Sequence, residues 1–318
     1  MYSAIQCQYI VERGLAILKR HGIHVETGSP LKRALDSVLA RESERERFND
    51  PNRFVPGERD TVGLYAMFVK LVNADAKGRL EPFIGHLKLL SKGEPTSNVK
   101  HSSDPESNKL FELYFGLSVS SLASKVEMDN PKKSAGSNPD VIAQIGDKRW
   151  GFACKVVHSE NPQTHFDRWV DGVDQIERAE VDYGIVVFKL TNIFKHDSVF
   201  QSRSDGAAVK YSAFSHPGQA DARLNDFVTC FVNDVQESVG KEQLRAIFRS
   251  SKCFPMCLAF VQTTAPIMQG SKAVTTCLSC AISIAVTGQR LVCPCSTLEQ
   301  VGKQLVSQVV SSKVLLPG

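Results

Sequence analysis

The chain has 318 residues, of which 42% are hydrophobic and 23% are charged, values typical of a soluble globular protein and not of a disordered one. No apolar run reaches the about 18 residues that a membrane-spanning helix needs, and the N-terminus mixes charged residues into its apolar ones, unlike a signal peptide. The nine cysteines therefore predict free thiols in a reducing cytoplasm. A formal net charge of +4 permits a nucleic-acid partner without identifying one.

The first 92 residues predict a helical region. Apolar residues recur there at helical spacing, and Ser29-Pro30 offers an N-cap hydroxyl followed by a proline at the first helical position. We expect helices at about residues 4–20, 30–41, 61–74 and 82–90, with a charge-rich loop at 41–60 that holds two prolines. For the residues of this region, a structural role is a better interpretation than a catalytic or binding one. The polar residues 92–103 predict a linker.

The middle of the chain, about residues 104–250, predicts an α/β unit built around a β-hairpin at 138–155. Apolar residues alternate along both arms of this hairpin, and Gly146-Asp147 supplies the tight turn. Around it the patterns predict, in order, a helix at 104–123, a strand at 125–128, the two hairpin strands, a helix at 162–179 and a buried strand at 183–190. The expected order is therefore helix, three strands, helix, strand.

The remaining residues complete a three-part division of the chain. We expect a long polar loop at 191–219, a helix at 221–248, a strand at 256–267 and a last helix at 298–310. The division is a helical N-terminal region at 1–92, the core at 104–250, and a C-terminal α/β extension at 251–318.

Two short motifs of the hairpin resemble those of a known family. Asn138-Pro139-Asp140 at its start and Ala153-Cys154-Lys155 at its end are similar to the motifs of the PD-(D/E)xK nuclease superfamily. The second motif of the hairpin normally reads acid-any-Lys, and Ala153 stands here in place of the acid. The expected element order is also that of the superfamily's core. The resemblance therefore implies an α/β, restriction-endonuclease-like fold, with a mixed sheet flanked by helices and a helical N-terminal region.

The resemblance also implies a site at one end of the sheet. Asp140 and Lys155 are expected within one side chain's reach of each other, with Glu112 of the preceding helix facing them. Mg²⁺ or Mn²⁺ would be held by Asp140, Glu112 and the carbonyl of Cys154, because hard divalent cations prefer oxygen ligands. Lys155 would stabilise developing negative charge. Gln175 falls where related nucleases often carry a glutamine.

Three acids on the helix after the hairpin offer a replacement for the missing carboxylate. Asp167, Asp171 and Asp174 lie at positions i, i+4 and i+7 and so share one face. Some restriction enzymes of the superfamily draw this ligand from the next helix, so Asp167 or Asp171 is the candidate metal ligand. The alternative is that Arg168 and Arg178 neutralise these acids and that the set is structural.

The other candidates have structural alternatives as well. Asp140 alone can cap a loop, and Lys155 alone can be a solvated strand end. A zinc site would draw on Cys253, Cys257, Cys277, Cys280, Cys293 and Cys295. The apolar segment after the C-x-x-C pair favours core packing of these thiols instead. His158, His165 and His196 could bind phosphate or transfer protons, but isolated histidines are more often surface groups, and we interpret them so.

The leading interpretation is a Mg²⁺-dependent endonuclease that hydrolyses phosphodiester bonds in DNA, with restriction or phage defence implied by analogy alone. Its partners would be DNA and, by the same analogy, a second copy or a defence-system protein, without a membrane. One alternative is a catalytically silent protein of the same fold that binds nucleic acid or a protein partner. Another is an unrelated structural α/β subunit. Metal-dependent cleavage separates the first from the second, and salt-dependent nucleic-acid binding separates the second from the third.

Overall fold

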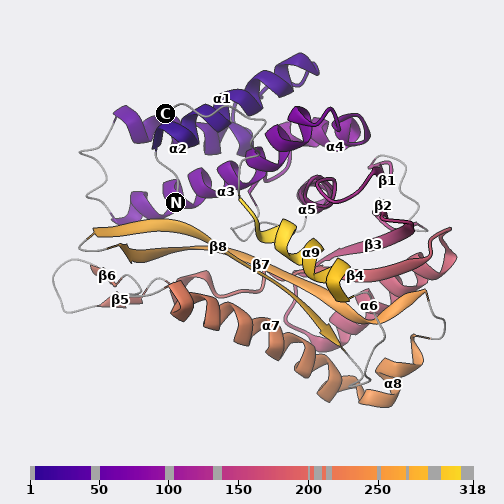
Figure 1. The fold of residues 1–318 in the computed structure, drawn as a ribbon. Helices are drawn as coiled ribbons and strands as arrows, with labels where there is room; N and C mark the ends of the chain where they lie inside the picture. Colours follow the sequence, from indigo (N-terminus) through magenta and orange to yellow (C-terminus); the bar gives the residue numbers. More distant parts are fainter. Residues whose placement is uncertain are drawn as a thin grey trace.

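The computed structural model describes residues 4–43, 51–96, 104–131, 138–199, 201–203, 210–212, 217–248, 252–269, 272–285 and 295–308. Within these residues, six strands form one mixed sheet (Figure 1). In spatial order the strands are β1 (Lys125–Met128), β2 (Val141–Ile145), β3 (Lys148–Val156), β4 (Tyr183–Lys189), β7 (Cys253–Gln269) and β8 (Lys272–Ala285). A separate two-stranded hairpin joins β5 (Gln201–Arg203) to β6 (Lys210–Ser212).

The directions of the strands bring three charged residues to the same end of the sheet. β3 runs parallel to β4, and β4 runs parallel to β7, whereas β1 with β2, β2 with β3 and β7 with β8 are antiparallel pairs. Because β2 is antiparallel to β3, the start of β2 lies at the same edge as the end of β3. Asp140 directly precedes β2, and Lys155 is the last residue but one of β3. We call this place, marked by Asp140, Lys155 and Lys189, the carboxyl edge.

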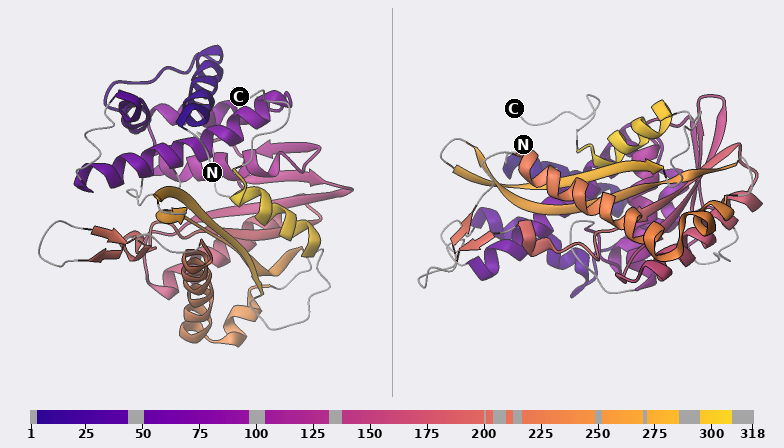
Figure 2. Two further views of the ribbon diagram at one scale, coloured as in Figure 1. Left: turned by 60° about the vertical axis from the view of Figure 1, so that its left-hand side comes forward. Right: turned by 90° about the horizontal axis from the view of Figure 1, so that it is seen from below.

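Helices cover both faces of the sheet, and each face has its own hydrophobic core. One face carries α1 (Ala4–Arg20), α2 (Pro30–Ser43), α3 (Pro51–Ala76), α4 (Ile84–Leu87), α5 (Pro105–Val119) and α9 (Cys295–Val306). The other carries α6 (Pro162–Arg178), α7 (Pro217–Val239) and α8 (Lys241–Ala246). In the left view of Figure 2 the indigo and purple helices lie above the sheet and α7, in orange, lies below it. Alternation along β3 explains the division, since Phe152 packs into the first core and Ala153 into the second.

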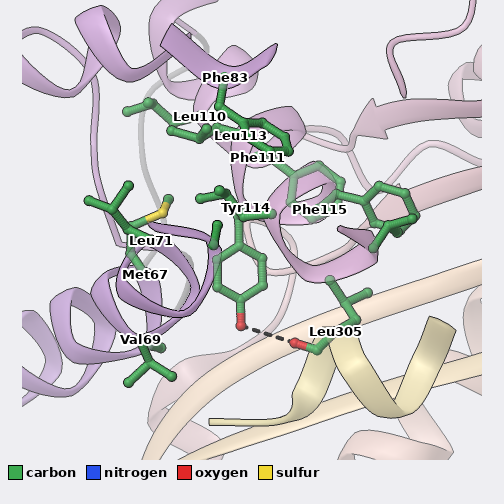
Figure 3. Close-up of a cluster of buried hydrophobic side chains, with 14 of the residues drawn as sticks. Met67, Val69, Leu71, Phe83, Leu110, Phe111, Leu113, Tyr114, Phe115 and Leu305 are labelled. Atoms are coloured by element: carbon green, nitrogen blue, oxygen red, sulfur yellow. Dashed lines mark hydrogen bonds between the residues drawn. The ribbon is translucent and has the colours of Figure 1, made fainter. Parts of the chain in front are cut away.

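The helix α5 lies at the centre of the first core. From Leu110 to Val119 every one of its residues is buried, as expected for a helix that is apolar on nearly all sides. The Phe115 ring lies 5.1 Å from that of Phe152 on the sheet, and the Tyr114 hydroxyl donates to the carbonyl of Leu305 in α9 at 3.0 Å. Figure 3 shows Tyr114 pointing from α5 towards α9. This packing fixes α5 against the sheet and so fixes the polar residues at its N-terminal end.

The expected order of helix, three strands, helix, strand is confirmed by α5, β1, β2, β3, α6 and β4. Asp104 caps α5 by accepting from the backbone N–H of Ser107 at 2.7 Å. Gly146 turns the hairpin with a φ of 62°, a conformation that glycine adopts without strain. Local patterning therefore predicts this part of the fold well.

Two segments expected to be loops contain regular structure. Residues 51–60 belong to α3, whose first residue is Pro51. A proline at the first helical position loses no intrahelical hydrogen bond, so it marks the start of a helix as readily as a loop. The expected loop 191–219 holds the short helix η4 (His196–Val199), the hairpin β5–β6 and the beginning of α7.

Three other predictions differ from the structure. The segment expected as one helix at 82–90 consists of η2 (Glu81–Phe83), α4 and η3 (Lys88–Ser91). The helix expected at 221–248 is divided into α7 and α8 at Gly240, which has a φ of 82°. The strand β8 was not predicted, because its small side chains carry a weak strand signal and its pairing with β7 is long-range.

The expected linker falls partly outside the described residues, which omit 97–103. Its described part is packed: Thr96 is buried and donates its hydroxyl to Glu94 at 2.6 Å. The first hydrophobic core draws residues from all three expected segments, such as Ile10, Phe115 and Leu305. In the part of the chain that the structure describes, we find no helix with the length and apolar character to cross a membrane.

Candidate functional site

The carboxylate of Asp140 is anchored to the backbone of β3 at the carboxyl edge. Its Oδ2 accepts from the backbone N–H of Cys154 at 2.8 Å, and its backbone carbonyl accepts from the N–H of Asp129 at 3.0 Å. The pair Val141–Phe152 is the last in register between β2 and β3, so Asp140 continues that register by one position. Only 6% of Asp140 is exposed. A buried carboxylate held by a strand N–H has a defined position rather than a free rotamer.

Glu112 approaches Asp140 from α5, through a lysine that contacts both. The ammonium of Lys109 donates to Glu112 at 2.8 Å and 3.0 Å from its two carboxylate oxygens, and lies 3.5 Å from Oδ1 of Asp140. His86 of α4 also contacts Glu112, with its Nε2 3.2 Å from Oε2. Glu112 and His86 are both buried. Two buried carboxylates, a buried imidazole and the half-buried ammonium of Lys109 therefore form one cluster.

A second lysine enters the carboxyl edge from β3. The ammonium of Lys155 donates to Oε1 of Gln175 in α6 at 2.8 Å, and both side chains are buried. The close approach of α6 depends on Gly172. A Cβ at this position would lie 2.8 Å from a methyl of Val186 and 3.3 Å from Cε of Lys155. The glycine thus lets α6 press Gln175 against the end of β3.

Burial raises the pKa values of both acids in the cluster. Burial raises the pKa of Asp140 to about 7, and the neighbouring charge of Glu112 adds to this shift while Lys109 and Lys155 oppose it. Burial likewise raises the pKa of Glu112, against the pull of Lys109. Burial alone would lower the pKa of Lys109, but the carboxylates of Glu112 and Asp140 outweigh it and raise that pKa. The nearby positive charge therefore does not offset the effect of burial on the two acids. Their negative charge keeps Lys109, which contacts both, protonated.

The two remaining basic groups respond to burial in the ordinary direction. Burial lowers the pKa of Lys155, although the charges of Asp140 and Asp171 oppose the shift. Burial and the charge of Lys109 lower the pKa of His86 to about 4, so this imidazole is neutral near neutral pH. A neutral His86 can satisfy the Glu112 carboxylate only as the tautomer that carries its proton on Nε2.

Of the three acids on α6, one acts on the cluster. Asp171 is exposed, and its charge reaches Lys155. Asp167 is exposed as well, and its carboxylate accepts from the side-chain amide of the residue four positions earlier at 2.8 Å. Asp174 lies 3.5 Å from Arg178 in an exposed ion pair, as the structural alternative expects. The charge of Asp171 thus acts on Lys155, while Asp167 is engaged in its own hydrogen bond.

Sequence reasoning missed Lys109 and His86. Lys109 precedes Glu112 by three residues on α5, and this spacing of opposite charges was a readable signal. His86 lies 26 residues before Glu112 and is brought to it by the packing of α4 on α5. No local pattern marks that contact.

The site offers oxygen donors, whereas the thiols that the structure describes do not gather at a zinc site. Asp140, Glu112 and the carbonyl of Cys154 are the oxygen ligands that Mg²⁺ prefers. Among the described residues, no three His, Cys, Asp or Glu side chains gather closely enough to hold a metal ion. Cys277 and Cys280 are three residues apart on β8, so they face opposite sides of the strand. Cys293 and the side chain of Cys295 lie outside the described residues.

The three histidines named from the sequence have structural partners. His165 and His196 are buried, so their interpretation as surface groups is wrong, and His158 is half-buried. The contacts are His158 Nε2 with Asn108 at 2.9 Å, His165 Nε2 with the carbonyl of Ser159 at 2.6 Å, and His196 Nδ1 with Thr263 at 2.8 Å. They order the loops that follow β3 and β4.

No protein-family model, curated protein or solved structure matches this chain.

Proposed function

We propose that the chain is a divalent-metal-dependent nuclease with a restriction-endonuclease-like core, and that it hydrolyses phosphodiester bonds in DNA. The observation that supports this most is the convergence of Asp140, Glu112 and Lys155 at one edge of a mixed sheet. They come from three separate elements, and Gln175 of a fourth supports the lysine. The order of α5, β1, β2, β3, α6 and β4 is the order that the PD-(D/E)xK resemblance implies.

The residues at the site fit a divalent ion. Asp140, Glu112 and the carbonyl of Cys154 would hold it, and the raised pKa values of the two acids indicate a pocket short of positive charge. When bound, Mg²⁺ or Mn²⁺ neutralises phosphate charge and lowers the pKa of a water molecule. Lys155 balances the negative charge that develops on the phosphate oxygens. Its hydrogen bond to Gln175 orients the ammonium for this role.

Asp171 is our proposed substitute for the acid that Ala153 lacks. Ala153 is fully buried against α6, so this position of β3 contributes packing and no charge. The charge of Asp171 acts on Lys155 from the next helix, whereas Asp167 is occupied by its own hydrogen bond. A carboxylate on a solvent-exposed turn can still reach the edge when a cation attracts it.

Cleavage of plasmid DNA with Mg²⁺, with Mn²⁺ and with a chelator tests the proposal. Asp140→Asn keeps the acceptor for the N–H of Cys154 and removes the charge, so we expect at least about a hundredfold loss of cleavage with the fold intact. Lys155→Met should lose as much.

The matched control is Asp182→Asn, because Asp182 accepts from the strand N–H of Arg149 at the same 2.8 Å but at the opposite end of β3. This variant should cleave like the unmodified protein. Cleavage that survives Asp140→Asn, or that persists in the chelator, would overturn the assigned roles.

The second candidate is a silent protein of the same fold that binds nucleic acid. The contact of Lys109 with both carboxylates favours it, because this pair already has a counter-ion. Salt-dependent DNA binding without cleavage in any divalent ion would support this candidate over the nuclease.

A further inference from the structure

Lys109 contacts both carboxylates of the site, which also form a hydrogen bond with each other. Its ammonium lies 2.8 Å from Oε1 and 3.0 Å from Oε2 of Glu112, and 3.5 Å from Oδ1 of Asp140. A divalent ion shared by these carboxylates would bind their oxygens at about 2.0–2.6 Å. The ammonium and such an ion would therefore use the same carboxylate oxygens.

The environment of Lys109 differs from that of the other lysine at the edge. The Lys155 ammonium donates to the neutral amide of Gln175. Lys109 makes its contacts to the two acids themselves, and 17% of its side chain is exposed, compared with 7% for Glu112 and 9% for Asp140. A lysine on a flexible four-carbon stem with a path to solvent can withdraw, whereas the two carboxylates stay buried.

We propose that Lys109 is a built-in counter-ion that competes with the divalent cation for Glu112 and Asp140. Without a metal ion its ammonium offsets part of the charge of the pair, and metal binding requires that it move away from the carboxylates. The inference rests on the metal site of the proposed function and adds its regulation. Lys109 thus sets the metal concentration at which the site fills, and it acts as a positioning residue and not as a catalytic one.

Calorimetric titration with Mn²⁺ at about pH 8 measures the competition. Lys109→Met keeps the aliphatic stem and removes the charge, so Mn²⁺ should bind at least about tenfold more tightly than to the unmodified protein. Lys125→Met is the matched control, because Lys125 also pairs with a glutamate, Glu127 at 2.8 Å, but is 74% exposed and pairs in register with Gln144, at the end of β2 away from Asp140. Its affinity should be unchanged. Equal or weaker binding by Lys109→Met contradicts the inference.

A second measurement uses the unmodified chain and does not depend on a variant that folds. An amine-reactive acylating reagent, read out by mass spectrometry, reports how accessible each lysine is. Mn²⁺ should increase acylation of Lys109 several-fold and leave Lys125 unchanged. With Asp140→Asn the increase should disappear. Protection of Lys109 by Mn²⁺, or no change, overturns the inference.

Failure of this inference and failure of the proposed function are distinguishable. Cleavage by the unmodified protein, together with a Mn²⁺ affinity that Lys109→Met leaves unchanged, would retain the nuclease and reject the competition. Tighter Mn²⁺ binding by Lys109→Met, with no cleavage by either protein, would retain the competition and reject the nuclease.

Discussion

At the N-terminal end of α5, Lys109 lies between the carboxylates of Glu112 and Asp140. Beside the second half of the same helix, Lys70 lies 5.6 Å from the centre of the Tyr114 ring and donates to two backbone carbonyls at the end of α9. Burial opposes the charge of both lysines. The carboxylates outweigh it and raise the pKa of Lys109, whereas burial dominates at Lys70 and lowers its pKa to about 7.

The two lysines have different roles. The carboxylates of Glu112 and Asp140 keep Lys109 charged, and the same carboxylates can attract another cation in its place. Carbonyl dipoles and an aromatic ring solvate Lys70 only in part, so its contacts serve to join α3 to α9. Substitutions near Lys109 should therefore alter metal binding and cleavage, and those near Lys70 should alter stability.

The largest effect is expected from Tyr114→Ala. This change removes a fully buried ring that touches α9 and the sheet, and the free energy of unfolding should fall by about 3–5 kcal/mol. Chemical denaturation measures the loss. The folded fraction should bind Mn²⁺ with unchanged affinity, and an affinity that falls along with stability would break the separation between the two ends of α5.

Glu112→Gln should reduce cleavage at least about hundredfold, because it removes a metal ligand and the strongest partner of Lys109. Initial rates of plasmid cleavage measure the effect. The control is Glu127→Gln, since Glu127 also pairs with a lysine and an arginine but is 41% exposed, compared with 7% for Glu112. Equal rates for both variants would place Glu112 among structural residues.

The Lys70 end should depend on pH. The folded pKa of about 7 lies below the ordinary value of 10.5, so between these values the unfolded chain binds a proton that the folded chain does not. Stability should therefore rise with pH from about 7 towards 10.5, by up to about 1.4 kcal/mol per pH unit. Denaturation of the unmodified protein and of Lys70→Met at several pH values isolates the contribution of Lys70 to the free energy of unfolding. Parallel profiles for the two proteins would show that Lys70 stays charged when folded.

The smallest effect is expected from Tyr114→Phe. It keeps the ring and removes the hydroxyl that donates to Leu305, so the free energy of unfolding should fall by about 1 kcal/mol. Thermal and chemical denaturation both measure this change. A loss as large as that of Tyr114→Ala would mean that the hydrogen bond, and not the packing of the ring, joins α5 to α9.

Local chemistry made much of the fold predictable. Alternating apolar residues and Gly146 predicted β2 and β3, and Asp104 predicted the start of α5. The motif at Asp140 and Lys155 predicted two residues of the carboxyl edge, because antiparallel pairing necessarily brings the start of one strand to the end of the next.

Contacts between distant segments were not predictable in the same way. β8 is a strand because β7 pairs with it, and His86 meets Glu112 because α4 packs on α5. The choice between Asp167 and Asp171 depends on how α6 is rotated against the sheet. Helical spacing gives the shared face of these acids but not the direction in which each side chain points.

The joint between α5 and α9 has a consequence for biosynthesis. Tyr114 meets Leu305 across 191 residues of sequence, and Lys70 meets Ser307 across 237. At ribosomal rates, roughly 10 to 40 seconds pass between the synthesis of Tyr114 and that of its partner. During this interval α9 has not been synthesised, so the contacts that join it to Tyr114 and Lys70 form late in the folding of the first core.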